Sequence, residues 1–245
     1  MQASEFFKNF IFRAKLLLLA IVAQHVHREN GMWQQFQPAL GEPAEWLGDW
    51  HPLVEQLGSA NGLVALGEIS SAMQIPHVRD LSSLRCFLRD YQKHILLPHE
   101  LPAIQRAFDH VCRHEVRELA EFDRRLADEP ALKPFAEASR RVGQTELLKL
   151  RPLRDERIVR RYLEAVDRGD AHAWHTLVYG LTLAIYSMPL RQGLLGYGFQ
   201  TTRGFIYAAA KSLELSEVNC RALLGELCSN LPTAVEELIA QRQAA

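Results

Sequence analysis

A group of potential metal ligands lies between residues 110 and 115, where the chain reads His-Val-Cys-Arg-His-Glu. His110 and His114 are four residues apart, which places both imidazoles on one face of a helix, as in zinc sites of the HExxH type. However, Glu115 does not take the place of the glutamate in that motif, Cys112 points away from the shared face, and Arg113 opposes a cation. A helical metalloenzyme or metal-binding protein that uses His110 and His114 is therefore one hypothesis, and a solvated helix surface is the other.

A glycine-rich stretch is the second candidate for chemistry, with Gly193, Gly196, Gly198 and Gly204. The spacing does not fit a dinucleotide-binding fingerprint, because Thr201 stands where a third glycine is required and no strand-like segment leads in. Glycines within a helix weaken it by about 1 kcal/mol each relative to alanine. We therefore expect this helix to pack closely against another helix or a partner.

Motifs of nucleotide hydrolysis and of nucleophilic catalysis do not occur in the sequence, which has neither a GxxxxGK[ST] loop nor a GxSxG elbow. His172 and His175 flank Trp174 at the start of a predicted helix, where the helix dipole disfavours a protonated imidazole. We expect both histidines to be neutral and hydrogen-bonded. The sequence thus predicts a protein that is not an enzyme, with no cofactor, no catalytic residues and no resident metal.

The composition is that of an ordinary globular protein, with 48% hydrophobic and 23% charged residues in a chain of 245. The formal net charge is −1, so no overall basic field exists to bind nucleic acid or an anionic membrane. We interpret the four cysteines, none of which forms a CxxC pair, as small buried hydrophobic residues in a reducing, cytoplasmic compartment. They are Cys86, Cys112, Cys220 and Cys228.

The N-terminal region contains the apolar run LLLLAIVA at residues 16–23. It is far shorter than the roughly 20 residues of a membrane-spanning helix. Glu5 lies where a secretory leader is positively charged, and no clear cleavage site follows. We therefore predict a core helix over residues 4–28, short helical turns in the tryptophan-rich residues 32–52, and two short helices over residues 53–73.

Apolar residues at helical spacing predict helices along the rest of the chain. We expect Asp80 or Ser82 to cap a helix that ends at Pro98, and a long helix to run from Pro102 to about Leu126. The first of these helices carries an apolar stripe of Leu84, Phe87, Leu88, Tyr91 and Ile95. Further helices are expected over about 135–148 and 158–166, the latter closed by Gly169, and from Trp174, Leu190, Ser216 and Thr233. No segment alternates like a strand, so the predicted fold class is all-α, a single bundle-like domain of about ten helices.

Three blocks of the sequence, in this order, resemble the urease accessory protein UreF family. Residues 77–108 hold an Asp-x-x-Ser-Leu start that leads a helix, followed by a second helix that opens near a proline. Residues 117–150 hold the second block, with Ala138, Ser139, Arg141, Gly143, Leu147, Leu148 and Leu150. The third block has His175, Gly180, Pro189 and Leu190, and then the basic Lys211. The resemblance covers most of residues 54–237.

The chain also departs from the family pattern, which is why it is identified as a diverged member. Ala60-Asn61-Gly62 lacks the proline of the family's N-terminal turn, and Glu214 to Glu217 differs from the family's segment after the basic residue. Residues 1–52 are longer and richer in tryptophan than the family's beginning. The expected organisation is a single UreF-like helical domain over residues 1–245, with residues 1–52 as a diverged N-terminal extension.

The resemblance implies a non-catalytic scaffold, or chaperone, for nickel insertion into urease. Such a protein dimerises, bridges a UreD/UreH-type accessory protein and the GTPase UreG, and docks with them on apo-urease. The partner-binding residues would lie on the C-terminal helices, as a polar rim around apolar packing. The expected rim residues are Arg203, Lys211, Ser216, Glu217 and Arg221.

Overall fold

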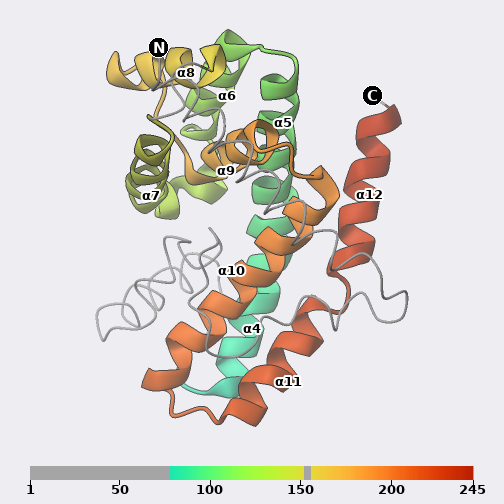
Figure 1. The fold of residues 1–245 in the computed structure, drawn as a ribbon. Helices are drawn as coiled ribbons and strands as arrows, with labels where there is room; N and C mark the ends of the chain where they lie inside the picture. Colours follow the sequence, from blue (N-terminus) through green and yellow to red (C-terminus); the bar gives the residue numbers. More distant parts are fainter. Residues whose placement is uncertain (1–77, 152–155, 245) are drawn as a thin grey trace, which may run out of the picture. The chain divides into compact units, whose positions relative to one another are not determined.

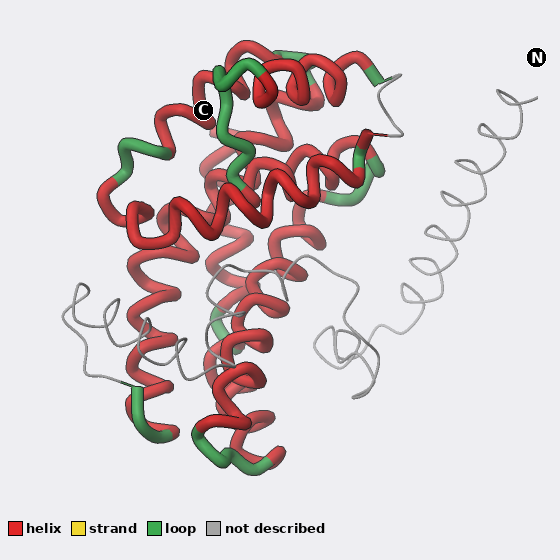
Figure 2. The backbone as a smooth tube through the Cα atoms, turned by 90° about the vertical axis from the view of Figure 1, so that its left-hand side faces the viewer, coloured by secondary structure: helices red, strands yellow, loops and turns green. Residues whose placement is uncertain are grey.

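The computed structural model describes residues 78–151 and 156–244, in which helices are joined by short turns (Figure 1). Figure 2 shows helix and loop in this described part and no strand. The all-α prediction is therefore confirmed. The predictions for residues 4–28, 32–52 and 53–73, and for the extension over residues 1–52, lie outside the described residues.

The helical elements follow one another closely along the chain. They are α4 (Leu81–Tyr91), the π-helix η3 (Gln92–Glu100), α5 (Leu101–Cys112), α6 (Val116–Leu126), the 3₁₀-helix η4 (Pro130–Phe135), α7 (Ala136–Lys149), α8 (Arg157–Asp167), α9 (His175–Ile185), α10 (Leu190–Ser212), α11 (Glu217–Cys228) and α12 (Leu231–Ala244). None of these described helices is long and apolar enough to cross a membrane.

The start of α4 follows the predicted capping chemistry. Asp80 Oδ1 accepts a hydrogen bond from the Ser83 backbone N–H at 2.8 Å, and Ser83 Oγ accepts from the Asp80 N–H at 3.0 Å. This reciprocal capping box satisfies two amides that have no partner within the helix. The predicted apolar stripe of α4 and η3, from Leu84 to Ile95, is buried.

The prediction that the first helix ends at Pro98 is wrong. The backbone continues through η3 into α5, with Pro98 inside the π-helix and Pro102 in the first turn of α5. The Leu101 N–H donates to the Leu96 carbonyl, five residues back. The wider π turn accommodates a proline ring that would clash with the carbonyl four residues back in an α-helix. It also leaves Glu100 buried in the protein interior.

The prediction of one long helix from Pro102 to about Leu126 is also wrong, because α5 ends at Cys112 and α6 begins at Val116. His114 adopts a φ of 59°, its N–H donates to the Val111 carbonyl, and the Glu115 N–H donates to the His110 carbonyl. This pair of bonds is a Schellman motif, which ends α5 and lets α6 start in a new direction.

The same motif ends other helices of the described part, mostly without glycine. Gly169 (φ 78°) closes α8, as the sequence predicts, but Ser187 (φ 55°) closes α9 and Glu214 (φ 52°) follows α10. A left-handed conformation is unfavourable for residues with a Cβ atom. These two turns therefore retain strain that glycine would relieve.

Helix α9 lies at the centre of the upper group of helices in Figure 1, against α5 and α7. A Cβ atom on Gly180 would lie 2.5 Å from the Ile104 carbonyl oxygen of α5, and one on Gly143 of α7 would lie 1.9 Å from the Ala173 carbonyl oxygen. Glycine at these two positions is what permits the close approach of the backbones.

The expected close packing of α10 is confirmed at two of its glycines. A Cβ atom on Gly193 would lie 2.3 Å from a methyl of Leu183, and one on Gly198 would lie 2.8 Å from a methyl of Leu231. Both contacts are made within the chain, with α9 and α12. Helix α12 is also held by ion pairs, Arg191 of α10 with Glu236 and Arg242 with Asp109 of α5.

The interpretation of the cysteines is correct for only half of them. Cys220 and Cys228 are buried on α11, and burial raises the pKa of the Cys228 thiol to about 12. Cys86 and Cys112 are exposed and are not packed as core residues. Their helices turn those positions toward solvent while the neighbouring Phe87 and Val111 fill the core.

Replacing Ser187 by glycine should stabilise the protein. The left-handed φ disfavours a side chain by about 1–2 kcal/mol, and the greater freedom of glycine in the unfolded chain offsets about 0.4–1 kcal/mol of this. We expect the free energy of unfolding of Ser187→Gly to rise by roughly 0.5–1 kcal/mol, measured by urea denaturation. Ser212→Gly, the same change in the last turn of α10, should instead lower it. A loss of stability in Ser187→Gly would contradict the strain argument.

Candidate partner-binding surface and its supporting core

Two of the C-terminal helices, α10 and α11, lie side by side below α9 in Figure 1. Ser216 is the N-cap of α11, and its Oγ accepts a hydrogen bond from the Asn219 N–H at 3.2 Å. The cap fixes the start of α11 directly after the turn at Glu214. Side chains on the last turns of α10 thereby face those on the first turns of α11.

Four side chains on these facing turns form a connected group, which we name the α10–α11 polar cluster: Arg203, Tyr207, Glu217 and Arg221. The Arg203 guanidinium carbon lies 5.6 Å from the centroid of the Tyr207 ring. The Tyr207 hydroxyl donates to Glu217 Oε1 at 2.9 Å, and Arg221 Nε donates to the same oxygen at 2.8 Å. The Arg221 and Glu217 side chains are 61% and 45% exposed, so a partner can reach them.

The charges of the cluster are coupled. Hydrogen bonds from Arg221 and Tyr207 lower the pKa of the Glu217 carboxyl. Partial burial and the hydrogen bond to Glu217 raise the pKa of Tyr207 to about 12, so its hydroxyl remains a donor at neutral pH. The cluster therefore presents an ionised carboxylate between two guanidinium groups and one aromatic ring. Arginine and tyrosine are enriched at the energetic centres of protein interfaces.

The structure brings together three of the five residues predicted for the polar rim. Arg203, Glu217 and Arg221 belong to the cluster, and Tyr207, which joins them, is a residue that the sequence analysis missed. Ser216 lies beside the cluster, but its hydroxyl is engaged in capping α11. Lys211 lies on α10, and its side chain is outside the described residues.

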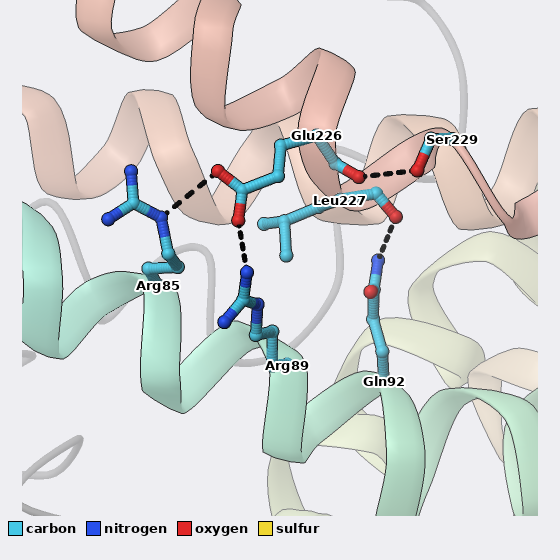
Figure 3. Close-up of polar contacts among 6 residues, drawn as sticks. All are labelled: Arg85, Arg89, Gln92, Glu226, Leu227 and Ser229. Atoms are coloured by element: carbon cyan, nitrogen blue, oxygen red, sulfur yellow. Dashed lines mark hydrogen bonds and ion pairs between the residues drawn. The ribbon is translucent and has the colours of Figure 1, made fainter.

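Helix α11 is anchored to α4 by a second polar group (Figure 3). The Glu226 carboxylate accepts hydrogen bonds from Arg85 Nε at 3.0 Å and Arg89 Nη2 at 2.6 Å. One turn on, Gln92 Nε2 donates to the Leu227 carbonyl at 3.3 Å. These ion pairs are partly exposed and contribute modestly to stability, but together they fix the position of α11 along α4.

The predicted shared helical face of His110 and His114 does not exist. Helix α5 ends at Cys112, and His114 lies in the left-handed turn that follows. His110 Nδ1 instead lies 2.8 Å from Glu115 Oε2. In residues 78–151 and 156–244, no three His, Cys, Asp or Glu side chains are grouped so that they could hold a metal ion.

The most extensive polar network of the interior was missed as a unit by the sequence analysis, which expected only that His175 is hydrogen-bonded. Ser139 Oγ lies 2.6 Å from His175 Nδ1, and His175 Nε2 lies 2.6 Å from the Tyr197 hydroxyl. Glu100 Oε2 then accepts hydrogen bonds from Tyr197 at 3.2 Å and from Tyr91 at 2.6 Å. All five residues are buried. We name them the buried hydrogen-bond chain.

A neutral His175 gives the buried hydrogen-bond chain a consistent order of donors and acceptors. The Glu100 carboxylate accepts from both tyrosines, so Tyr197 has its oxygen left to accept from His175 Nε2–H. A neutral histidine protonated at Nε2 then accepts at Nδ1 from the Ser139 hydroxyl. The expected hydrogen bonding of His175 is confirmed, and its neutral state stays a prediction.

A serine bonded to a histidine resembles a catalytic pair, but the environment favours a structural role. Ser139 is 0% and His175 is 7% exposed. The cavity next to them has a volume of only ≈ 10 Å³, which is too small for a substrate carbonyl group with its substituents. The pair instead joins α7 to α9.

Asp123 of α6 is a second buried polar anchor. Its Oδ2 accepts hydrogen bonds from the Tyr162 hydroxyl of α8 and from the Ala173 N–H at 2.8 Å. Ala173 has a φ of 57°, so this bond helps to hold a left-handed residue directly before α9. Burial raises the pKa of the Asp123 carboxyl, and its hydrogen bonds oppose that rise only in part.

Two comparisons with known proteins bear on these observations. A family model described as UreF matches residues 78–228, more than half of the chain of 245 residues. The matched region runs from the start of α4 to the end of α11. It therefore contains the buried hydrogen-bond chain, the Glu226 anchor and the α10–α11 polar cluster. A search of curated proteins found no match.

Tyr197→Phe should destabilise the protein, because it removes the central hydroxyl of the buried hydrogen-bond chain. His175 Nε2–H then lacks its acceptor, and Glu100 loses one donor. We expect the free energy of unfolding to fall by about 1–3 kcal/mol, measured by urea denaturation. Tyr186→Phe, at a tyrosine that is 39% exposed, is the matched control. Equal effects of the two substitutions would show that the buried hydrogen-bond chain does not stabilise the fold.

Asp123→Asn should change how stability depends on pH. The folded-state pKa of Asp123 is raised, so the contribution of this group to stability is present below its unfolded pKa of about 3.9 and is lost as pH rises through the folded pKa. The neutral amide keeps an acceptor for Tyr162 and Ala173 and has no such loss. The variant should therefore gain stability relative to the wild type as pH rises from about 4, whereas exposed Asp128→Asn should not. If the stability difference between Asp123→Asn and the wild type does not change with pH, the raised pKa assigned to Asp123 is wrong.

Proposed function

The chain belongs to the UreF family of urease accessory proteins, and from this premise we propose that it acts as a non-catalytic scaffold in the insertion of nickel into urease. The observation that carries the proposal is the family match over residues 78–228. The described interior supports a scaffold, because its polar groups are used to hold helices together. Nickel is the cargo of the assembly and is not a resident cofactor of this chain.

We propose that the α10–α11 polar cluster lies in the interface with the partners. Arg221 and Glu217 are already oriented by their mutual hydrogen bond, and Arg203 by one from its Nη1 to Gln200 Oε1 at 3.2 Å, which lowers the entropy that is lost when a partner binds. Val218, which follows Glu217 on α11, is 75% exposed and offers an apolar contact next to the charges. A polar rim around a small apolar centre is typical of protein interfaces.

The proposed partners are a UreD/UreH-type accessory protein, the GTPase UreG and apo-urease, with a homodimer of this chain as the central unit. Binding of this kind favours one conformation of each partner and thereby couples nucleotide hydrolysis to metal transfer. The near-neutral net charge of −1 is in keeping with protein partners rather than nucleic acid or membrane. We place this assembly in the cytoplasm.

Co-purification tests the proposal. The full chain, expressed with a UreD/UreH-type protein and a UreG-type GTPase from the same genome, should be recovered in one complex by size-exclusion chromatography. Urease activity should appear only when the chain is present and nickel is supplied. Failure to bind either partner, with all components folded, would overturn the scaffold function.

Charge reversal at the cluster should weaken the complex without unfolding the chain. We expect Arg221→Glu to raise the Kd for the accessory partner at least about tenfold, equivalent to roughly 1.4 kcal/mol, measured by calorimetry or interferometry. Arg160→Glu, on α8 with a side chain that is 57% exposed, is the matched control and should bind like the wild type. Equal affinities of both variants would remove the cluster from the interface while leaving the scaffold function standing.

A further inference from the structure

A small cavity lies beside the buried hydrogen-bond chain, between η3, α5, α7 and the start of α9. Its volume is ≈ 10 Å³, and the polar residues that line it include Glu100, Ser139 and Thr176. Apolar residues line it as well, among them Ala103 of α5 and Phe135 of η4. The scaffold function makes no use of this cavity.

Trp174, which also lines the cavity, carries an unsatisfied donor. The residue is 2% exposed, and its indole Nε1–H has no hydrogen-bond partner in the described part of the chain. The guanidinium of Arg140 lies over the indole ring, 5.7 Å from the centroid, so it covers the face of the ring without accepting from its N–H. A buried N–H without an acceptor is strongly unfavourable, and native proteins satisfy such groups in nearly all cases.

We propose that this cavity is a binding site for one ordered water molecule. The water accepts a hydrogen bond from Trp174 Nε1 and donates to a side-chain oxygen of Glu100 or Ser139, which line the same cavity. The cavity volume of ≈ 10 Å³ limits the ligand to a single water, which needs roughly 10–15 Å³ of cavity volume. Buried waters occupy sites of this kind, in which a buried polar group lacks a partner within the protein.

The bound water would extend the buried hydrogen-bond chain to the loop that precedes α9. His175, Trp174 and Thr176 are consecutive residues at the start of that helix. His175 is fixed by Ser139 and Tyr197, whereas the indole of Trp174 makes no direct hydrogen bond to the buried hydrogen-bond chain. The water supplies that bond and fixes the orientation of the indole beneath Arg140.

Nuclear magnetic resonance of the full-length protein tests the site directly. The Trp174 indole N–H, assigned through its loss in Trp174→Phe, should show a cross-peak to a long-lived water in nitrogen-edited NOE and ROE spectra. Ala103→Val fills the cavity with two further methyl groups and should abolish that cross-peak. An absent cross-peak in the wild type, or one that persists in Ala103→Val, would overturn the proposal.

Thermal stability provides a second and independent readout. Ala103→Val displaces the water and leaves the indole unsatisfied, so its melting temperature should fall by at least about 2–4 °C. Ala103→Ser is the matched variant, because its hydroxyl can take over the place of the water oxygen, and it should melt close to the wild type. If the cavity is dry, the added methyl groups of valine fill an empty space, and Ala103→Val melts higher than Ala103→Ser, which overturns the proposal.

Discussion

The buried hydrogen-bond chain from Ser139 to Tyr91 is the constraint that fixes how the described helices pack. Apolar surfaces alone tolerate small rotations and shifts of one helix against another. A carboxylate, an imidazole and two phenols in a medium of low dielectric do not, because each lost partner carries a large desolvation penalty. Since these groups come from α4, η3, α7, α9 and α10, satisfying them sets the relative positions of all five elements.

The helices that carry the buried hydrogen-bond chain approach one another closely at two glycines. Gly143 lets α7 approach the residues just before α9, and Gly180 lets α9 approach α5. The first contact lies next to His175, which bonds Ser139 of α7 and Tyr197 of α10. Ser139, Gly143, His175 and Gly180 are also residues on which the resemblance to the UreF family rests. In this protein, these four residues of the family pattern take part in the packing of α7, α9 and α5.

The sequence predicted the helices well and their ends less well. Apolar spacing identified α4, α7 and α8 because a buried stripe is a strong periodic signal. Gly169 was correctly predicted as a helix end, whereas Ser187 and Glu214 were missed, because tertiary packing imposes a left-handed conformation that their side chains disfavour. The prediction that a helix ends at Pro98 was wrong because a π turn accommodates this proline within a continuous helix.

The candidate site was only partly predictable for a similar reason. Charged residues on the C-terminal helices could be assigned to a surface, but their connection through Tyr207 depends on how α10 faces α11. The pairing of Ser139 with His175 spans 36 residues and leaves no local signal in the sequence. Contacts of this kind are products of the completed fold.

Helix α10 links the rigid interior to the proposed interface. Tyr197 is a member of the buried hydrogen-bond chain, and Arg203 and Tyr207 of the same helix belong to the surface cluster. At 1.5 Å per residue, about 15 Å of uninterrupted helix separates Tyr197 from Tyr207. A surface mounted on such a helix keeps its shape before a partner arrives, so little binding energy is lost in ordering it. The scaffold function proposed above requires a surface of this kind, and the buried hydrogen-bond chain holds the helix that carries it.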